Sequence, residues 1–427
     1  MPIEVDDKFK LALNLMEGSK TNLLITGRAG TGKSTLLEYF RSITKKNVAV
    51  LAPTGVAALN VKGQTIHSFF RFKPDITVDT VKKLSPMQRQ MYLNLDAIVI
   101  DEISMVRADL LDCVDAFMKA NGKDASLPFG GVQMIFVGDL YQLPPVVTKD
   151  EEEMFKGPYR SQYFFDSNSF RELSMQSIEL EKHHRHTEEY FIELLNAIRN
   201  NTITAEQLDV LNLRLKPEFV PDGSKVYITL TTTNRVADEI NTKELARLSS
   251  VEHLYNATLD GDFDKKILPA DEVLRVKEGM QIMMLNNDRA ERWVNGSVGK
   301  VIGINQGIAD RDVIIVKLSD GSEVEVGPNT WDMFKFSYDQ KVRKLLPKSA
   351  GSFTQYPIMP AWAVTIHKSQ GKTFQNVIID IGGGTFANGQ LYVALSRCTT
   401  LRGIVLRRPI ERRHILTDPR IVEFLKK

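Results

Sequence analysis

The sequence predicts an α/β protein in which two parallel β-sheets follow one another and a small β domain interrupts the second. Short apolar runs such as NLLITG (22–27) and AIVIDE (97–102) alternate with helical patterns in the first half of the chain. Unbroken apolar runs are typical of strands buried on both faces of a parallel sheet, and their alternation with helices is typical of a layered α/β domain. A second series of such runs, from VYITLTTTN (226–234) to GIVLRRP (403–409), predicts the second sheet.

The inserted β domain is expected over residues 279–349. The stretches VNGSVGKVIGI and VIIVKLSDGSEVEVG alternate apolar and polar residues around Asn-Gly and Asp-Gly pairs, which are signals for β-hairpins. A run rich in lysine and arginine, KFSYDQKVRKLLPKSAG, closes this region. A solvated hairpin is its plainest interpretation.

Composition and charge agree with a folded chain of several domains. At 427 residues the chain is long enough for roughly two to four domains. The net charge of +2 excludes no partner, because local patches decide which molecules a surface attracts. The two cysteines, Cys113 and Cys398, cannot build a disulfide framework, so a reducing compartment is expected. The acidic start MPIEVDDKFK predicts no signal peptide, and no apolar run reaches the roughly 18 residues of a membrane span.

A phosphate-binding loop is predicted at GRAGTGKST (27–35), which fits the pattern G-x-x-x-x-G-K-[ST]. Glycines let the backbone curl so that successive N–H groups face phosphate oxygens, and the helix that follows presents its positive end to the same anion. Lys33 adds a full positive charge, and Ser34 can place a hydroxyl on Mg²⁺. The pattern predicts a nucleotide with Mg²⁺ here, with contacts from Gly27, Ala29, Gly30, Thr31, Gly32, Lys33, Ser34 and Thr35.

An acidic pair and a glutamine supply the groups that hydrolysis needs. Asp101, at the end of an apolar run, is placed to hold Mg²⁺ directly or through water, and Glu102 is placed to deprotonate the attacking water. Alone, such a pair is more often a cap, but the phosphate-binding loop upstream favours catalysis. In VGDLYQLPPV, Gln142 could bond the γ-phosphate or the water; a polar turn stiffened by Pro144 and Pro145 is the alternative.

The order of the motifs is more specific than either site. GRAGTGKS, APTGVAAL, GQTIHSFF, VIDEISM, GDLYQLPPV, TIHKSQGKTF and YVALSRCT follow one another as in superfamily 1 helicases. The segment from ISMVRADLL to PFGGVQ resembles a signature of the Pif-type DNA helicases (petite integration frequency family), and the resemblance covers about residues 10 to 410. It implies two RecA-like domains in tandem, over 1–180 and over 181–278 with 350–427, a small wedge insertion at 64–75, and an SH3-like fold for the insertion at 279–349.

The resemblance also implies an ATP site between the two domains. Arg397 in YVALSRCT and Arg185 in LEKHHRHTEE match arginines that reach the γ-phosphate from the second domain, and Gly371 matches a position near that phosphate. The histidines around Arg185 suggest a metal site by themselves, yet only His183 and His186 share a helical face, which is too few ligands for zinc. Relatives carry a glutamine ahead of the loop that reads adenine; the segment DDKFKLALNLM contains none, so selectivity for ATP stays open.

A path for single-stranded DNA across both domains is implied by the same resemblance, since such tracks need phosphate donors and flat faces for bases. Phenylalanines interleave with basic residues in SFFRFKP (68–74), where relatives carry the wedge; in the alternative interpretation at least two of these rings are core residues. The basic end of the chain, from LRGIV onward, either lies along DNA or closes the fold as a solvated helix. The residues matched to strand contacts are Thr54, Gly55, His67, Phe69, Arg71, Asn234, His367 and Lys368.

We expect an ATP-dependent DNA helicase that moves 5′ to 3′ on single-stranded DNA, a polarity that only the resemblance supplies. The expected partners are single-stranded DNA and 5′-tailed or forked duplex DNA, with guanine-quadruplex DNA as a further family substrate, in DNA repair, recombination or replication. A monomer without a membrane partner is expected, cytoplasmic and nucleoid-associated if bacterial. The alternative is a DNA-stimulated ATPase that translocates or remodels nucleoprotein without separating strands, since both activities need the same motifs.

Overall fold

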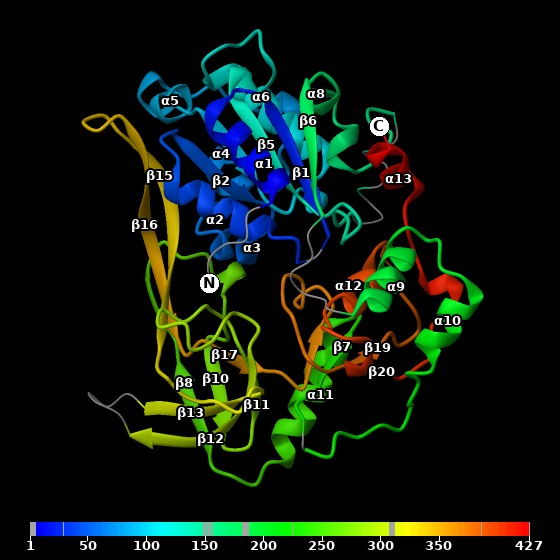
Figure 1. Cartoon of the computed structure of the whole chain (residues 1–427). Helices are drawn as coiled ribbons and strands as arrows, with labels where there is room; N and C mark the ends of the chain where they lie inside the picture. The colour runs from blue at the N-terminus through cyan, green and yellow to red at the C-terminus, as the bar shows by residue number, and fades with distance from the viewer. Residues whose placement is uncertain are drawn as a thin grey trace.

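The chain folds into two layered α/β domains and a region built mainly of strands. The computed structural model describes residues 6–426 except 29, 148–150, 152–154, 156, 182–187, 224, 307–311 and 386. The first α/β domain lies at the top of Figure 1, the second at its lower right, and the strand region at its lower left. No helix among the described residues is long and apolar enough to cross a membrane.

A six-stranded parallel sheet forms the first domain, in the order β3-β2-β4-β5-β1-β6. Its central strands are buried on both faces, as their unbroken apolar sequences predict. The strands are β1 (Asn22–Gly27), β2 (Val48–Ala52), β3 (Gln64–Thr65), β4 (Ala97–Ile100), β5 (Gln133–Gly138) and β6 (Met175–Leu180). The helices of this domain are α1 (Asp7–Gly18), α2 (Lys33–Ile43), α3 (Gly55–Asn60), α4 (Ile66–Phe70), α5 (Pro86–Leu93), α6 (Ala108–Asn121) and α8 (Asn168–Arg171).

Residues 64–70 of the predicted wedge (64–75) are part of the first domain itself. Gln64–Thr65 is strand β3, which pairs in parallel with β2, and α4 follows it directly. Phe69 and Phe70 are 2% and 1% exposed, and Phe69 packs edge to face against both Phe70 and Tyr92. Because aromatic rings gain most from full burial, residues 64–70 join the core of the first domain. Arg71, Lys73, Pro74 and Asp75 are exposed beyond them, and a wedge role for that turn stays a prediction.

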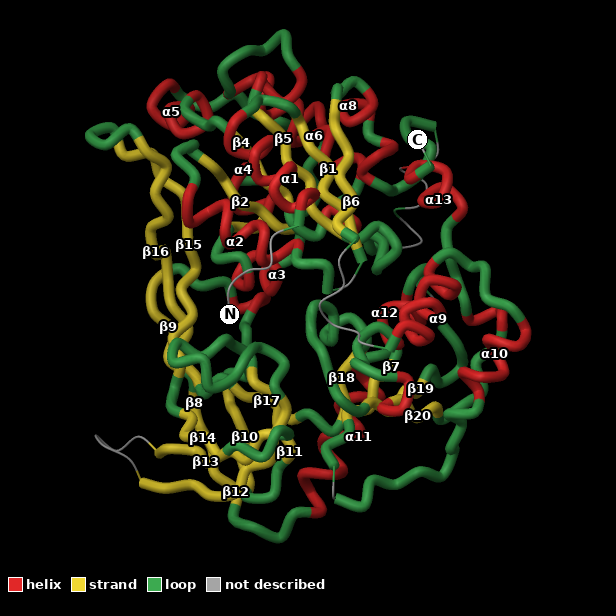
Figure 2. The backbone as a smooth tube through the Cα atoms, in the orientation of Figure 1, coloured by secondary structure: helices red, strands yellow, loops and turns green. Residues whose placement is uncertain are grey.

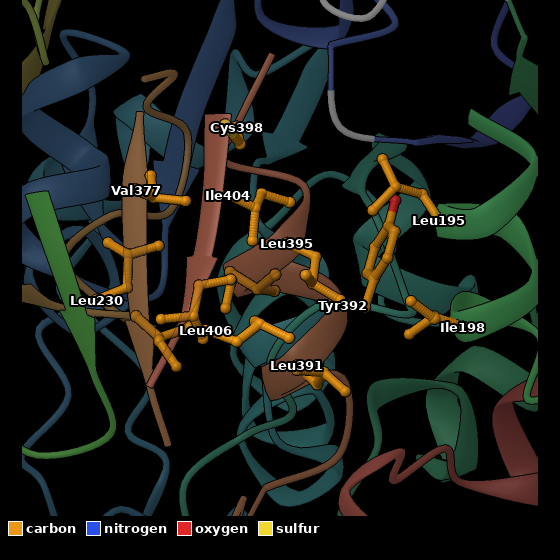
Figure 3. Close-up of a cluster of buried hydrophobic side chains, with 14 of the residues drawn as sticks. Leu195, Ile198, Leu230, Val377, Leu391, Tyr392, Leu395, Cys398, Ile404 and Leu406 are labelled. Atoms are coloured by element: carbon orange, nitrogen blue, oxygen red, sulfur yellow. The ribbon is translucent and has the colours of Figure 1, made fainter. Parts of the chain in front are cut away.

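The second domain is a smaller parallel sheet in the order β18-β7-β19-β20. Figure 3 shows its core, in which Leu230 and Val377 on the strands gather with Leu391 and Leu395 on a helix. The strands are β7 (Ile228–Thr231), β18 (Ala363–Thr365), β19 (Val377–Asp380) and β20 (Ile404–Leu406). The helices are α9 (Glu189–Arg199), α10 (Ala205–Asn212), α11 (Asn234–Arg247) and α12 (Gln390–Leu395).

Three antiparallel sheets make up the strand region, in the orders β10-β8, β14-β13-β12-β11-β17 and β15-β16-β9. The region spans residues 252–360 and is wider than the predicted 279–349. The first strands were missed because the apolar residues Leu254 and Val273 lie on the exposed faces of their strands. Apolar residues on both faces remove the alternation that marks a half-buried strand in a sequence. The strands are β8 (Glu252–Asn256), β9 (Thr258–Gly261), β10 (Val273–Lys277), β11 (Gln281–Met284), β12 (Val298–Gln306), β13 (Asp312–Leu318), β14 (Glu323–Val326), β15 (Asn329–Asp339), β16 (Lys344–Gln355) and β17 (Ile358–Pro360).

The long hairpin of β15 and β16 leaves the strand region and runs up the side of the first domain (Figures 1 and 2). Phe336 N–H donates to Gln64 Oε1 at 2.9 Å, and Leu345 N–H donates to Asn47 Oδ1 at 2.9 Å. The Phe336 ring is 9% exposed and lies edge-on to Phe69, with centroids 5.9 Å apart. The basic run is therefore a hairpin with exposed lysine and arginine side chains, as expected, but its Phe336 and Leu345 dock it on the first domain.

The C-terminal helix α13 (Pro419–Leu425) crosses from the second domain back to the first (Figure 1). Phe424 stacks on Phe165 with centroids 4.4 Å apart and planes at 9°. Ile421 is 2% exposed and belongs to the core of the first domain. The apolar face of this helix is thus occupied by protein, and the helix ties the two domains together, which neither interpretation of the basic C-terminal end foresaw.

Phe424→Ala is expected to weaken this tie. Removing one ring of a stacked pair leaves a gap, which should lower the free energy of unfolding by about 2 kcal/mol. Glu423→Ala, at the exposed neighbouring position, is the matched control and should change that free energy little. Denaturant unfolding followed by circular dichroism measures both variants. Equal effects would show that the helix contributes no packing between the domains.

Candidate nucleotide site and strand-binding surface

The predicted phosphate-binding loop joins the end of β1 to the start of α2. Gly30 and Gly32 have φ angles of 82° and 87°, a left-handed conformation that glycine adopts without strain. Lys33 Nζ donates to the carbonyl oxygens of Gly27 at 2.6 Å and Arg28 at 2.9 Å. These bonds hold the ammonium group inside the curl of the loop, where a phosphate would lie.

The first turn of α2 is open to a ligand. Ser34 and Thr35 are exposed there, whereas Thr31 is 4% exposed and its hydroxyl donates to Arg28 O at 2.9 Å. Backbone N–H groups in the first turn of a helix have no partner within the helix, so they can bond phosphate oxygens. Ala29, also predicted to contact the nucleotide, lies outside the described residues.

Asp101 and Glu102 follow β4 at the carboxyl edge of the first sheet. Burial and the Asp101 carboxylate raise the pKa of Glu102 to about 7, although Lys33 opposes the shift. Burial also raises the pKa of Asp101, again against Lys33. Glu102 has a left-handed φ of 50°, which is strained for a residue with a β-carbon. A carboxyl group with a pKa near neutrality is suited to take a proton from water at physiological pH.

Mg²⁺ fits the donor set at this edge. Within the part of the chain that the structure describes, no group of three or more His, Cys, Asp or Glu side chains could hold a metal ion. Mg²⁺ commonly uses one or two protein oxygens, with waters and phosphate oxygens as its other ligands. The Ser34 hydroxyl and the Asp101 carboxylate are such oxygens, and a cation there would reduce the repulsion between Asp101 and Glu102. Arg185 and the neighbouring histidines lie outside the described residues.

A glutamine from the second domain reaches two predicted catalytic side chains of the first. Gln370 Nε2 donates to Gln142 Oε1 at 3.0 Å and to Glu102 Oε2 at 3.4 Å. Gln142 is 7% exposed, and its Nε2 donates to Asp139 Oδ2 at 3.1 Å. Sequence reasoning missed Gln370. The available signal was its place in TIHKSQGKTF, between residues matched to DNA and the glycine matched to the γ-phosphate.

Arg397 lies just after α12 and is fully buried in the second domain. Its guanidinium donates to Val393 O at 2.9 Å and to Ser396 Oγ at 2.8 Å. Its charge still reaches Glu102, whose pKa it lowers against the larger effect of burial. Gly371 has a left-handed φ of 77° and open space where a β-carbon would stand, so the backbone there leaves room for a ligand.

The two domains are in close backbone contact at Gly389, the residue before α12. Its φ of 71° is left-handed, and a β-carbon would lie 2.2 Å from Tyr141 O and 2.8 Å from Gln142 O. Because both distances are far below van der Waals contact, only glycine permits this approach. The segment that carries Gln142 is thereby held against the second domain.

The predicted strand contacts lie at helix starts and turns of both domains. Thr54 is exposed, and its hydroxyl caps the start of α3. Gly55 is buried, and it lies so close to Ile267 of the strand region that a β-carbon on it would stand 2.4 Å from the Ile267 side chain. Asn234 is exposed at the start of α11, and Lys368 is exposed in the turn after β18. Exposed polar groups on both domains are thus available to a strand, while Gly55 is covered in this arrangement.

Both predicted histidines are half-buried, and one predicted aromatic contact is wrong. Burial lowers the pKa of His67, helped by the charge of Arg107, and burial lowers the pKa of His367, so both favour the neutral form. Arg71 is exposed at the end of α4, with a φ of 59°. Phe69 cannot stack on a base here, because its ring is 2% exposed within the core of the first domain.

Comparisons with known proteins point to one family. A family model described as PIF1-like helicase matches residues 7–209, and one described as UvrD-like helicase C-terminal domain matches residues 360–405. The ATP-dependent DNA helicase Pif1 of Bdellovibrio bacteriovorus is 29% identical over 99% of this chain and 92% of its own length. The crystal structure of Bacteroides sp Pif1 with ADP-AlF4 has a TM-score of 0.90 at 34% identity, covering 99% of this chain and 96% of that one. Bacteroides Pif1 bound to ssDNA has a TM-score of 0.70 at 34% identity, covering 99% and 97%.

Glu102→Gln is expected to abolish turnover while ATP still binds, because the amide keeps the shape of the carboxyl group but cannot accept a proton. General-base removal should lower kcat for ATP hydrolysis by about a hundredfold or more. Glu38→Gln, exposed on α2, is the matched control. Phosphate release measures turnover, and a fluorescent ATP analogue measures binding. Near-normal turnover in Glu102→Gln would exclude Glu102 as the base.

Gly389→Ala is expected to push the domains apart at Gln142. A shift of about 1 Å at a group predicted to be catalytic should lower kcat by about tenfold or more, while the melting temperature changes little. Gly383→Ala is the matched control, since a β-carbon there meets nothing within 4 Å. ATP turnover and melting temperature, measured for both variants, check this. The same turnover in both would mean that the close approach does not position Gln142.

Proposed function

This chain belongs to the PIF1-like family of ATP-dependent DNA helicases, and from that premise we propose that it moves 5′ to 3′ along single-stranded DNA and unwinds 5′-tailed or forked duplexes. The observation that best supports ATP hydrolysis coupled to DNA is the contact of Gln370 with Gln142 and Glu102, whereas the polarity rests on the family alone. The turn that carries Gln370 also carries two residues matched to DNA contacts. A strand bound to that turn would therefore act directly on the groups that hydrolyse ATP.

The first domain would bind and activate the nucleotide. Lys33 and the N–H groups at the start of α2 bond the phosphates, with Ser34 and Asp101 as the proposed holders of Mg²⁺. The metal, when bound, neutralises charge on the phosphates and on the leaving oxygen. Glu102 orients the attacking water and takes its proton, and Gln142 bonds the water or the γ-phosphate.

The second domain would complete the site with positive charge. Arg397 and Arg185 neutralise the γ-phosphate from across the cleft and hold the domains closed while ATP is bound. Hydrolysis and phosphate release remove that link, and the cleft relaxes. Such charge-linked closure is a two-state element that converts the nucleotide state into movement of a strand over both domains.

The strand itself would contact exposed polar residues on each domain, namely Thr54, Asn234 and Lys368. Because several of these contacts would be to phosphate, binding should weaken as salt rises. Forked DNA, guanine-quadruplex DNA and roles in repair, recombination or replication are further parts of the proposal, supported by the family alone. A cytoplasmic location and a monomeric state stay predictions.

A directional unwinding assay tests the proposal. Fluorescent duplexes with a 5′ or a 3′ single-stranded tail are mixed with protein, ATP and Mg²⁺, and strand release is followed. Release from the 5′-tailed duplex, and none from the 3′-tailed one, is expected; Lys33→Ala is the control without hydrolysis. The opposite preference would exclude 5′ to 3′ movement. ATP turnover stimulated by single-stranded DNA without strand release would favour a translocating or remodelling ATPase.

A further inference from the structure

We propose that Arg199 is a positioning residue for ATP hydrolysis: it holds Asp139, and through Asp139 it orients Gln142. None of the motifs in the sequence analysis contains Arg199, which stands in LLNAIRNN at the end of α9. The inference rests on the proposed role of Gln142 and adds to it the group that fixes the Gln142 side chain.

Asp139 is the immediate anchor of Gln142. It follows β5 and is 0% exposed. Its Oδ2 accepts from Gln142 Nε2 at 3.1 Å and from the Tyr392 hydroxyl at 3.4 Å, and its Oδ1 accepts from Tyr141 N–H at 3.2 Å. An amide has a donor end and an acceptor end. Because the donor end of Gln142 faces Asp139, its acceptor end faces Gln370.

Arg199 is a buried cation that lies beside the buried carboxylate of Asp139. It is 5% exposed; its Nη2 lies 3.8 Å from Asp139 Oδ1 and 3.5 Å from Glu179 Oε1. Its guanidinium also lies over the Tyr141 ring, with Cζ 4.1 Å from the ring centroid. A carboxylate removed from water is costly unless a cation lies close to it. Tyr141, next to Gln142 in sequence, is thus held by stacking as well.

The contact joins the two domains. Asp139 and Tyr141 belong to the first domain, whereas Arg199 ends α9, whose Leu195 and Ile198 pack in the core of the second (Figure 3). The ion pair therefore exists only while α9 is docked against the first domain. The orientation of Gln142 therefore depends on the second domain through two separate contacts. One is made by Gln370, and the other is made by Arg199 through Asp139.

The experiment compares ATP turnover of Arg199 variants with and without Gln142. Arg199→Met keeps the length of the side chain and removes its charge, and Arg199→Lys keeps the charge and loses the planar stacking. Arg247→Met, on the exposed face of α11, is the matched control. Each is made alone and in a Gln142→Ala background, with saturating single-stranded DNA, and the melting temperature is recorded.

Arg199→Met should lower kcat by about tenfold, because breaking a buried charge pair leaves its partner unpaired. The KM for ATP should change little, Arg199→Lys should recover part of kcat, and the control should match the parent protein. In the Gln142→Ala background, Arg199→Met should cause no further loss, because two residues that act through one group are not additive.

Three results would overturn the proposal. The first is normal kcat in Arg199→Met. The second is the same loss with and without Gln142, which would mean that Arg199 acts independently of it. The third is loss of folding in both Arg199→Met and Arg199→Lys, which would make Arg199 a residue of stability alone. Normal kcat in Gln142→Ala itself would instead reject the role of Gln142 in the proposed function, and with it this inference.

Discussion

Gln370 of the second domain donates to Gln142 and Glu102 of the first, and these bonds exist only at one separation of the two parallel sheets. The close approach of Gly389 to the Tyr141 carbonyl sets that separation from the second domain. Hydrogen bonds weaken steeply with distance and angle, so a small displacement of either sheet breaks them. The groups predicted to hydrolyse ATP are therefore assembled by the contact between the domains, and neither domain holds them all alone.

Two kinds of contact join the parts of the molecule. Polar and charged groups face each other at the cleft, whereas apolar rings make the distant ties: Phe424 on α13 and Phe336 on the long hairpin both pack into the core of the first domain. Polar contacts can be exchanged for contacts with water or a phosphate at small net cost, but exposing a buried ring is costly. We expect the cleft to respond to ligands while the tie made by α13 limits how far the domains separate.

The electrostatics of the site also depend on both domains. Burial is the main cause that raises the pKa of Glu102; the charges of Asp101 and Asp139 raise it further, and those of Lys33 and Arg397 lower it. Together these effects raise its pKa to about 7, and one of the two opposing charges, that of Arg397, comes from the second domain. The pKa of the predicted base therefore depends on the position of the second domain, which is consistent with the proposed hydrolysis that depends on closure.

The sequence by itself determined the parallel sheets, the phosphate-binding loop and the acidic pair, because apolar periodicity and glycine-rich turns are local signals that a short segment carries in full. It could not decide that Phe69 is a core residue, that the antiparallel strand region begins at residue 252, or that α13 docks on the first domain. Nor did it single out Gln370 or Arg199. Each of these depends on which surfaces meet, and burial and cross-domain hydrogen bonds are set by contacts between residues far apart in the chain. Only the tertiary structure brings those residues together.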